Sequence, residues 1–149
     1  MSDLCVGIDF VRLSAETPVF FGGGPIQCSA WCPMPYDSVG PHSRAQYLAL
    51  STFHDEHRFR GAAQSSFAAR GAIQLWNCGP LRNAEAPTAV PHLDLCLAHD
   101  YGRVWDLEWC SSGCYDEARL GILAVAFSDG AVRVFPIPQP AKLLKSPER

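Results

Sequence analysis

The stretches "LAHDYGRVWDLEWCSSG" (97–113) and "RLGILAVAFSDGAVRVF" (119–135) decide the fold of this chain. The first contains an aromatic-rich run of strand length, and the second begins with a long apolar run. Ser128-Asp129-Gly130 is a turn signal of the kind that joins hairpin strands. After this turn, Val132 and Val134 alternate with other residues, which is the spacing of a β-strand. The pattern predicts three consecutive antiparallel strands.

The same three motifs occur earlier in the chain and in the same order. "GPIQCSAWCP" (24–33) aligns with "GRVWDLEWCS" (102–111), "YLALS" (47–51) with "ILAVA" (122–126), and "GAIQLW" (71–76) with "GAVRVF" (130–135). Loops of different length separate the motifs in the two halves. A shared order of motifs indicates a duplicated supersecondary unit with insertions in its loops.

Each unit is predicted to have a fourth strand. Three leucines alternate in "HLDLCLAH" (92–99), between the two units, and "TPVFF" (17–21) occupies the equivalent place ahead of the first unit. Four antiparallel strands form one blade of a β-propeller, but two blades cannot close a ring. We therefore predict an all-β fold, a partial WD40-type β-propeller of about two four-stranded blades whose ring is not closed.

The WD-repeat assignment depends on a few structural positions. In WD repeats, a His ahead of the first strand, an Asp in a tight turn and an aromatic residue ending the third strand brace the blade. The residues expected in such structural roles here are His99, Asp129, Trp76, Trp31, Trp109 and Gly130. Two departures stand out: Asn77 replaces the usual acid after Trp76, and Phe135 lacks an indole N–H. We expect the hydrogen-bond network of these repeats to be incomplete.

These patterns also suggest boundaries along the chain. Residues 1–16 are interpreted as a leader or the end of a preceding blade, and residues 17–138 as an incomplete WD40-like propeller. Within it, the first unit spans 17–99 and the second 100–138. Residues 139–149 are expected to be a polar tail, in which Ser146-Pro147 leaves proline-directed phosphorylation open.

The composition narrows the classes of function. A net charge of −3 gives no general electrostatic reason to bind nucleic acid. The seven cysteines are an odd number, and Asp3 and Asp9 interrupt what would otherwise be a signal peptide. A reducing compartment with free thiols is the natural interpretation.

Three patterns could indicate metal or phosphate binding. Cys28-x3-Cys32 and Cys110-x3-Cys114 have spacings that a zinc site permits, and "HDEH" (54–57) gathers potential ligands. The repeat explains Cys32 and Cys110 more simply, because they end equivalent strands, and "HDEH" has no helical spacing. "FGGGP" (21–25) lacks the Gly-Lys-Ser/Thr of a phosphate loop. We expect no cofactor and no metal, with a small zinc-binding protein as an alternative.

We also expect no enzymatic activity. His99 with Asp100 or Asp106 could form an acid–base pair, but the sequence places no nucleophile beside it. Known catalytic signatures, such as Gly-x-Ser-x-Gly or His-Glu-x-x-His, are absent from the sequence. A structural histidine in a blade is the favoured interpretation.

The ordered motifs resemble the WD-repeat (beta) subunit family of general transcription factor IIIC. The pieces that carry this resemblance are "TPVFFGGGPIQCSAWCP" (17–33), "QYLALS" (46–51), "IQLWNCGPL" (73–81), "CLAHDYGRVWDLEWCSSG" (96–113) and "RLGILAVAFSDGAVRVFPIP" (119–138). The resemblance covers most of residues 17–138. Because closed propellers use about 4–8 blades, it implies that the chain is a fragment or truncated form of a longer propeller.

The resemblance implies a nuclear, non-catalytic scaffold that supports RNA polymerase III transcription of tRNA-type genes. Its expected partners are the other subunits of the transcription factor IIIC complex, with promoter DNA contacted only indirectly. No membrane and no small-molecule substrate are expected, and the family has no catalytic residue to transfer. A WD-repeat adaptor of another intracellular complex remains the alternative within the same class.

Overall fold

The computed structural model describes residues 19–34, 45–52, 71–80, 90–112 and 114–143. Four strands form the first sheet in the order β1-β2-β3-β4: β1 (Ile26–Trp31), β2 (Tyr47–Thr52), β3 (Gly71–Asn77) and β4 (His92–His99). Three strands form the second sheet in the order β5-β6-β7: β5 (Val104–Trp109), β6 (Arg119–Phe127) and β7 (Val132–Pro138). A four-residue helix, α1 (Pro140–Leu143), follows.

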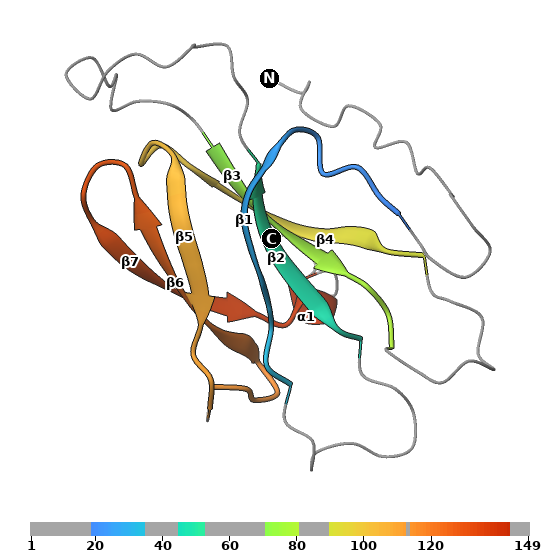
Figure 1. The fold of residues 1–149 in the computed structure, drawn as a ribbon. Helices are drawn as coiled ribbons and strands as arrows, with labels where there is room; N and C mark the ends of the chain where they lie inside the picture. The colour runs from blue at the N-terminus through green and yellow to red at the C-terminus, as the bar shows by residue number, and fades with distance from the viewer. Residues whose placement is uncertain (1–18, 35–44, 53–70, 81–89, 113, 144–149) are drawn as a thin grey trace, which may run out of the picture.

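All strand pairs are antiparallel, and the described residues form two sheets without a closed ring. The prediction of an all-β chain is therefore confirmed. β1 and β5, the first strands of the two sheets, lie side by side (Figure 1). Within the described part of the chain, no helix has the length and apolar character needed to cross a bilayer.

The predicted hairpin turn joins β6 to β7. Gly130 has a φ of 85°, a left-handed conformation that glycine adopts without steric cost. The Asp129 side chain accepts a hydrogen bond from the Ala131 N–H at 3.0 Å, and the Gly130 N–H donates to the Phe127 carbonyl at 3.1 Å. The turn residues named by the sequence thus fix the register of this hairpin.

The buried core lies between the two sheets. Its residues alternate along the strands, so that one face of each sheet points at the other. They are Cys32, Tyr47, Ala49, Ile73, Leu75, Val104, Leu107, Trp109, Leu120, Leu123, Val125, Phe127 and Ile137. The two sheets are therefore stacked units that share one apolar interior.

The segment ahead of β1 differs from the prediction. Residues 19–21, expected to be part of a strand, form none, and Thr17 and Pro18 lie outside the described residues. Phe20 instead stacks on Trp76 with ring centroids 4.3 Å apart, and the Gln74 amide donates to the Gly22 carbonyl at 2.8 Å. This segment lies over a sheet face, which is incompatible with pairing along an edge of the same sheet. The fourth strand of the first sheet is β4.

One hydrogen bond joins the inner strands directly. The Trp109 indole N–H, at the end of β5, donates to the Ala30 carbonyl of β1 at 3.1 Å. Trp31, its counterpart in the repeat, is 52% exposed, whereas Trp109 is 7% exposed. The tryptophan at this repeat position is thus buried and hydrogen-bonded in the second sheet, where it meets the first sheet, and exposed in the first sheet.

Trp109→Phe removes this donor and leaves the partly buried Ala30 carbonyl without it. We expect the free energy of unfolding to fall by about 1–2 kcal/mol, the usual cost of such a loss. Trp31→Phe, at the exposed counterpart, is the matched control and should change stability by less than about 0.5 kcal/mol. Equal losses in urea unfolding would show that the bond does not hold the sheets together.

Candidate interaction surface

The second sheet has one face packed on the first sheet and one face turned outward. Val132 and Val134 of β7 point outward and are 68% and 63% exposed. The register of β6 against β5 and β7 places alternate β6 residues on the same side. We call this surface the open face; it consists of Ile122, Ala124, Ala126, Val132, Val134 and Pro136.

The internal repeat shows which residues of the first sheet correspond to those of the open face. Ile73 and Leu75 of β3 occupy the repeat positions of Val132 and Val134, yet each is only 2% exposed. They are buried because the second sheet covers that face of the first. The remaining open-face positions align in the same way, with Tyr47, Ala49, Ser51 and Asn77 as their counterparts. The open face therefore corresponds to the face of the first sheet that the second sheet covers. No described residues cover the open face itself.

The inner edge of the open face carries negative charge. Asp106 and Glu108 of β5 are exposed and lie opposite Ala126 and Ala124 of β6. Their repeat counterparts in β1 are Cys28 and Ala30, which pack against the core. A cover that fits this face needs apolar side chains opposite β7 and a cationic or hydrogen-bonding group opposite β5.

The outer edge of the second sheet is also open. β7 pairs with β6 on one side, and among the described residues no strand pairs with its other side. In the first sheet, β4 pairs with this edge of the equivalent strand, β3. An exposed strand edge presents backbone donors and acceptors in a row and favours the addition of another strand.

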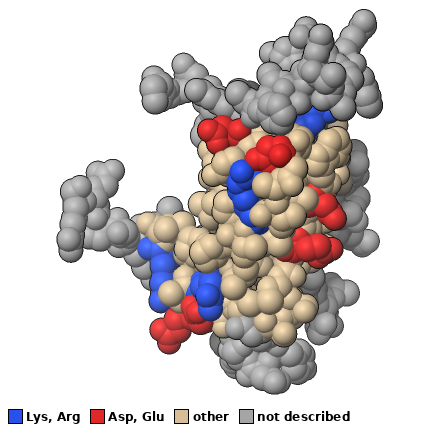
Figure 2. Space-filling view, turned by 90° about the vertical axis from the view of Figure 1, so that its left-hand side faces the viewer, with Lys and Arg blue, Asp and Glu red and all other residues tan. Residues whose placement is uncertain are grey.

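The charge on this side of the molecule is mixed. Figure 2 shows that uncharged residues make up most of the described surface there. Basic and acidic groups lie near one another in this view. A surface of this kind lacks the single basic stripe that binds phosphate backbones.

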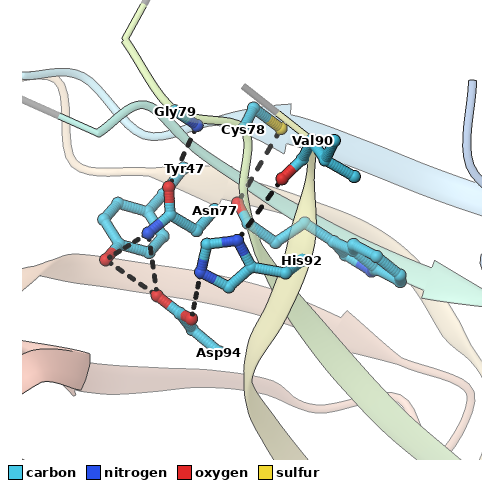
Figure 3. Close-up of polar contacts among 8 residues, drawn as sticks. Tyr47, Asn77, Cys78, Gly79, Val90, His92 and Asp94 are labelled. Atoms are coloured by element: carbon cyan, nitrogen blue, oxygen red, sulfur yellow. Dashed lines mark hydrogen bonds and ion pairs between the residues drawn. The ribbon is translucent and has the colours of Figure 1, made fainter. Parts of the chain in front are cut away.

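A polar cluster lies at one end of the first sheet. Asp94 of β4 accepts hydrogen bonds from the Tyr47 hydroxyl at 3.0 Å and the Asn77 amide at 3.1 Å (Figure 3). Its other oxygen pairs with the His92 ring at 3.0 Å. Asn77 in turn accepts a hydrogen bond from the Gly79 N–H at 3.0 Å. An acid on the neighbouring strand thus completes the network where Asn77 replaces the expected acid.

This cluster is built to hold strands together. Burial, followed by the hydrogen bond to Asp94 and its negative charge, raises the pKa of Tyr47, so the hydroxyl stays protonated as a donor. The hollow lined by residues such as Met34 and Tyr115 includes none of the residues of this cluster in its lining.

His99 lies in an aromatic cluster between the sheets. Its ring is stacked parallel to Tyr101, with centroids 6.1 Å apart, and meets Phe127 edge-on at 4.9 Å. Both ring nitrogens are buried and have no hydrogen-bond partner. A Cβ on Gly71 would come within 2.6 Å of the His99 ring, so the absence of a side chain at Gly71 makes room for it.

Asp129 reaches the same cluster through Arg133. The Arg133 guanidinium pairs with Asp129 and lies 3.8 Å from the centroid of the Tyr101 ring. This pairing lowers the pKa of Asp129, mainly through the hydrogen bond from Arg133. The structure therefore places His99 and Asp129 at opposite ends of one stack of side chains, with Tyr101 and Arg133 between them.

The tryptophans predicted to be structural occupy three different settings. Trp76 is fully buried under Phe20 and donates its indole N–H to Gln74 at 2.8 Å. Trp109 bridges the sheets, as described above, and Trp31 is half exposed at the end of β1. The role of Tyr101 and Arg133 was missed by sequence reasoning; the aromatic after His99 and the arginine four residues after Asp129 were the available signals.

The structure does not combine the pair Cys28 and Cys32 with the pair Cys110 and Cys114 into one four-thiolate site. Cys28 and Cys32 pack at the core, where burial raises the pKa of Cys28 to about 11 and that of Cys32 to about 12. Cys110 is exposed in the β5–β6 connection, near Cys114. Among the described residues, no group of three or more His, Cys, Asp or Glu side chains could hold a metal ion. "HDEH" (54–57) and Ser146 lie outside the described residues.

Asn77→Asp tests the polar cluster. It removes the amide donor to Asp94 and places a second carboxylate about 3 Å from the first, where like charges repel. We expect a loss of about 1–3 kcal/mol in unfolding free energy at pH 7. The double variant Asn77→Asp, Asp94→Asn restores one donor and one acid and should recover stability. Its failure to do so in urea unfolding would contradict the assignment.

His99 makes stability depend on pH. Burial lowers the pKa of His99 below its ordinary value of 6.5; the negative charge of Asp100 opposes this shift, and the positive charge of Arg133 reinforces it. Below pH 6.5 the unfolded chain therefore takes up a proton that the folded chain does not, and stability falls until the pH passes the lower folded pKa. The urea midpoint should drop between pH 7.5 and pH 5.5. His99→Leu should reduce that drop, and an unchanged drop would exclude His99 as its source.

The chain is similar to three curated proteins, whereas no protein-family model matches it. It is 36% identical over 135 residues to the protein named General transcription factor 3C polypeptide 2 of Homo sapiens, and equally to that of Pongo abelii. It is 30% identical over 120 residues to Transcription factor tau subunit sfc6 of Schizosaccharomyces pombe. These matches cover 84%, 84% and 78% of this chain.

The matched region is a small part of each relative. It spans 14% of the length of the human and orangutan proteins and 18% of the yeast protein. The similarity nevertheless extends over most of this chain. The chain is thus homologous to one segment of these transcription factor subunits.

Proposed function

We propose that this chain is a non-catalytic scaffold segment of a transcription factor IIIC subunit, folded as part of a WD40-type β-propeller. In this role it supports RNA polymerase III transcription of tRNA-type genes in the nucleus. The observation that carries the proposal is the 36% identity to General transcription factor 3C polypeptide 2 over 84% of the chain. The scheme of a first unit at 17–99 and a second at 100–138 is part of this proposal.

The open face supports the propeller. Propeller blades are antiparallel sheets stacked face to face, each covering one face of the next. The second sheet covers the first in this manner and presents an equivalent apolar face of its own. A further sheet, with apolar side chains opposite Val132 and Val134, is the cover that matches the repeat.

The arrangement of charged and titratable groups favours a scaffold over an enzyme. His99 is packed between aromatic rings, and the Asp94 oxygens are used by Tyr47, Asn77 and His92. These contacts use His99 and Asp94 to stabilise the packing of strands. The partners we propose are other subunits of the same complex, with promoter DNA contacted through them.

The test is affinity capture of the full-length subunit from nuclear extract, with identification of the recovered proteins by mass spectrometry. We expect the other transcription factor IIIC subunits to be recovered. Recovery of a different set of adaptor subunits would favour a WD-repeat protein of another complex and contradict the proposal.

A matched pair of variants tests the open face in the same experiment. Val132→Asp with Val134→Asp places two charges on it and should reduce recovery of the partners at least about fivefold, because buried charge is costly. Val90→Asp changes a valine that is 55% exposed away from this face and should leave recovery unchanged. Equal recovery with both variants would show that the open face is not covered in the assembly.

A further inference from the structure

The connection between β5 and β6 holds two neighbouring thiols. Cys110 directly follows β5, and Cys114 comes four positions later. Both thiols donate to the same acceptor, the Ser112 carbonyl oxygen, at 3.4 Å from Cys110 and 3.3 Å from Cys114. Two S–H groups that converge on one oxygen bring their sulfurs close together.

This thiol pair is accessible. Cys110 is exposed and Cys114 is partly exposed, and both line a hollow of about 180 Å³ together with Met34, Tyr115 and Leu120. Cys32 differs in this respect. Cys32 is buried and donates to the Leu120 carbonyl at 3.8 Å, inside the core. A reagent in solution therefore reaches Cys110 and Cys114 far more easily than Cys32.

The two thiols also differ from each other. The hydrogen bond from Cys114, followed by one with the Ser112 backbone, lowers the pKa of Cys110. The same thiol–thiol bond raises the pKa of Cys114, with the positive charge of Arg119 acting in the opposite direction. Cys110 is also the more exposed of the two, so a disulfide in solution reaches it first; we therefore assign Cys110 as the thiol that attacks and Cys114 as the thiol that resolves.

We propose that Cys110 and Cys114 form a reversible dithiol–disulfide site that reacts with low-molecular-weight disulfides of the glutathione type. The Cys110 thiolate attacks one sulfur of oxidised glutathione, and one glutathione thiolate leaves. The Cys114 thiol then loses its proton. The resulting thiolate attacks the Cys110 sulfur of the mixed disulfide, and the second glutathione thiolate leaves. Both protein protons end on the two glutathione molecules, which together gain the two electrons that the protein loses.

The site is separate from the open face. It lies in the loop after β5, whereas the open face consists of alternate residues of β6 and β7. The proposal depends only on the geometry of two thiols, so it can fail without affecting the proposed function, and the reverse also holds.

The experiment incubates the fully reduced chain with oxidised glutathione at pH 7.5, blocks the remaining thiols with iodoacetamide and maps the peptides by mass spectrometry. We expect a peptide joined within itself by a Cys110–Cys114 disulfide, while Cys28 and Cys32 remain reduced. The disulfide should open again on addition of excess reduced glutathione. Absence of the Cys110–Cys114 bond in the wild-type chain would overturn the proposal without the need for any variant.

Three variants separate the roles of the sulfurs. Cys114→Ser should trap Cys110 as a stable mixed disulfide with glutathione, and Cys110→Ser should react at Cys114 about fivefold or more slowly than the wild type does at Cys110. Cys96→Ser removes an exposed thiol of β4 and should leave the rate of Cys110–Cys114 closure unchanged. A Cys110 that reacts no faster than Cys96 in the wild type would contradict the assignment of the attacking thiol.

Discussion

An antiparallel sheet with apolar side chains on both faces needs another part of the protein packed against each face. The rest of this structure depends on that constraint. In the first sheet, Trp76 and Leu50 point to one side and Ile73 and Leu75 to the other, and all four are buried. The segment around Phe20 contributes to the cover on one side, and the second sheet provides it on the other. The second sheet repeats the same pattern of side chains, but only one of its faces is covered by described residues. The stack of sheets is therefore open at the β5–β7 end.

This constraint connects the fold with the proposed role. A structure that grows by stacking sheets presents broad surfaces and strand edges, which suit the assembly of proteins better than the enclosure of a small substrate. The titratable side chains fit the same interpretation: Asp94 joins three strands at one end of the first sheet, and His99 packs against Tyr101 of the β4–β5 connection and Phe127 of the second sheet. The thiol pair after β5 lies outside this packing, where chemistry can change without loss of the core.

Much of the fold could be predicted because its signals are local. The β6–β7 turn is predicted by Ser128-Asp129-Gly130, and the order of the repeated motifs predicts two related units. Residues 19–21 were misassigned because a short apolar run has the same composition in a strand and in a covering segment; stacking of Phe20 on Trp76 is a tertiary contact. Sequence also could not reveal that Asp94 of β4 supplies an acid beside Asn77, because a β-bulge between Leu75 and Trp76 sets that register. The repeat predicts that a neighbouring sheet is missing, but the strand register was needed to identify the residues of the open face.

Hydrogen exchange of the β7 backbone amides, compared between the isolated chain and the native assembly, tests the central claim most directly. Amides on the outer edge of β7 have no strand partner among the described residues and should exchange rapidly in the isolated chain. If another strand and another sheet complete this end of the stack, those amides should become strongly protected in the assembly, while those of β2 and β6, already central in their sheets, change little. Unchanged, rapid exchange along β7 in the assembly would contradict the claim that this end is covered.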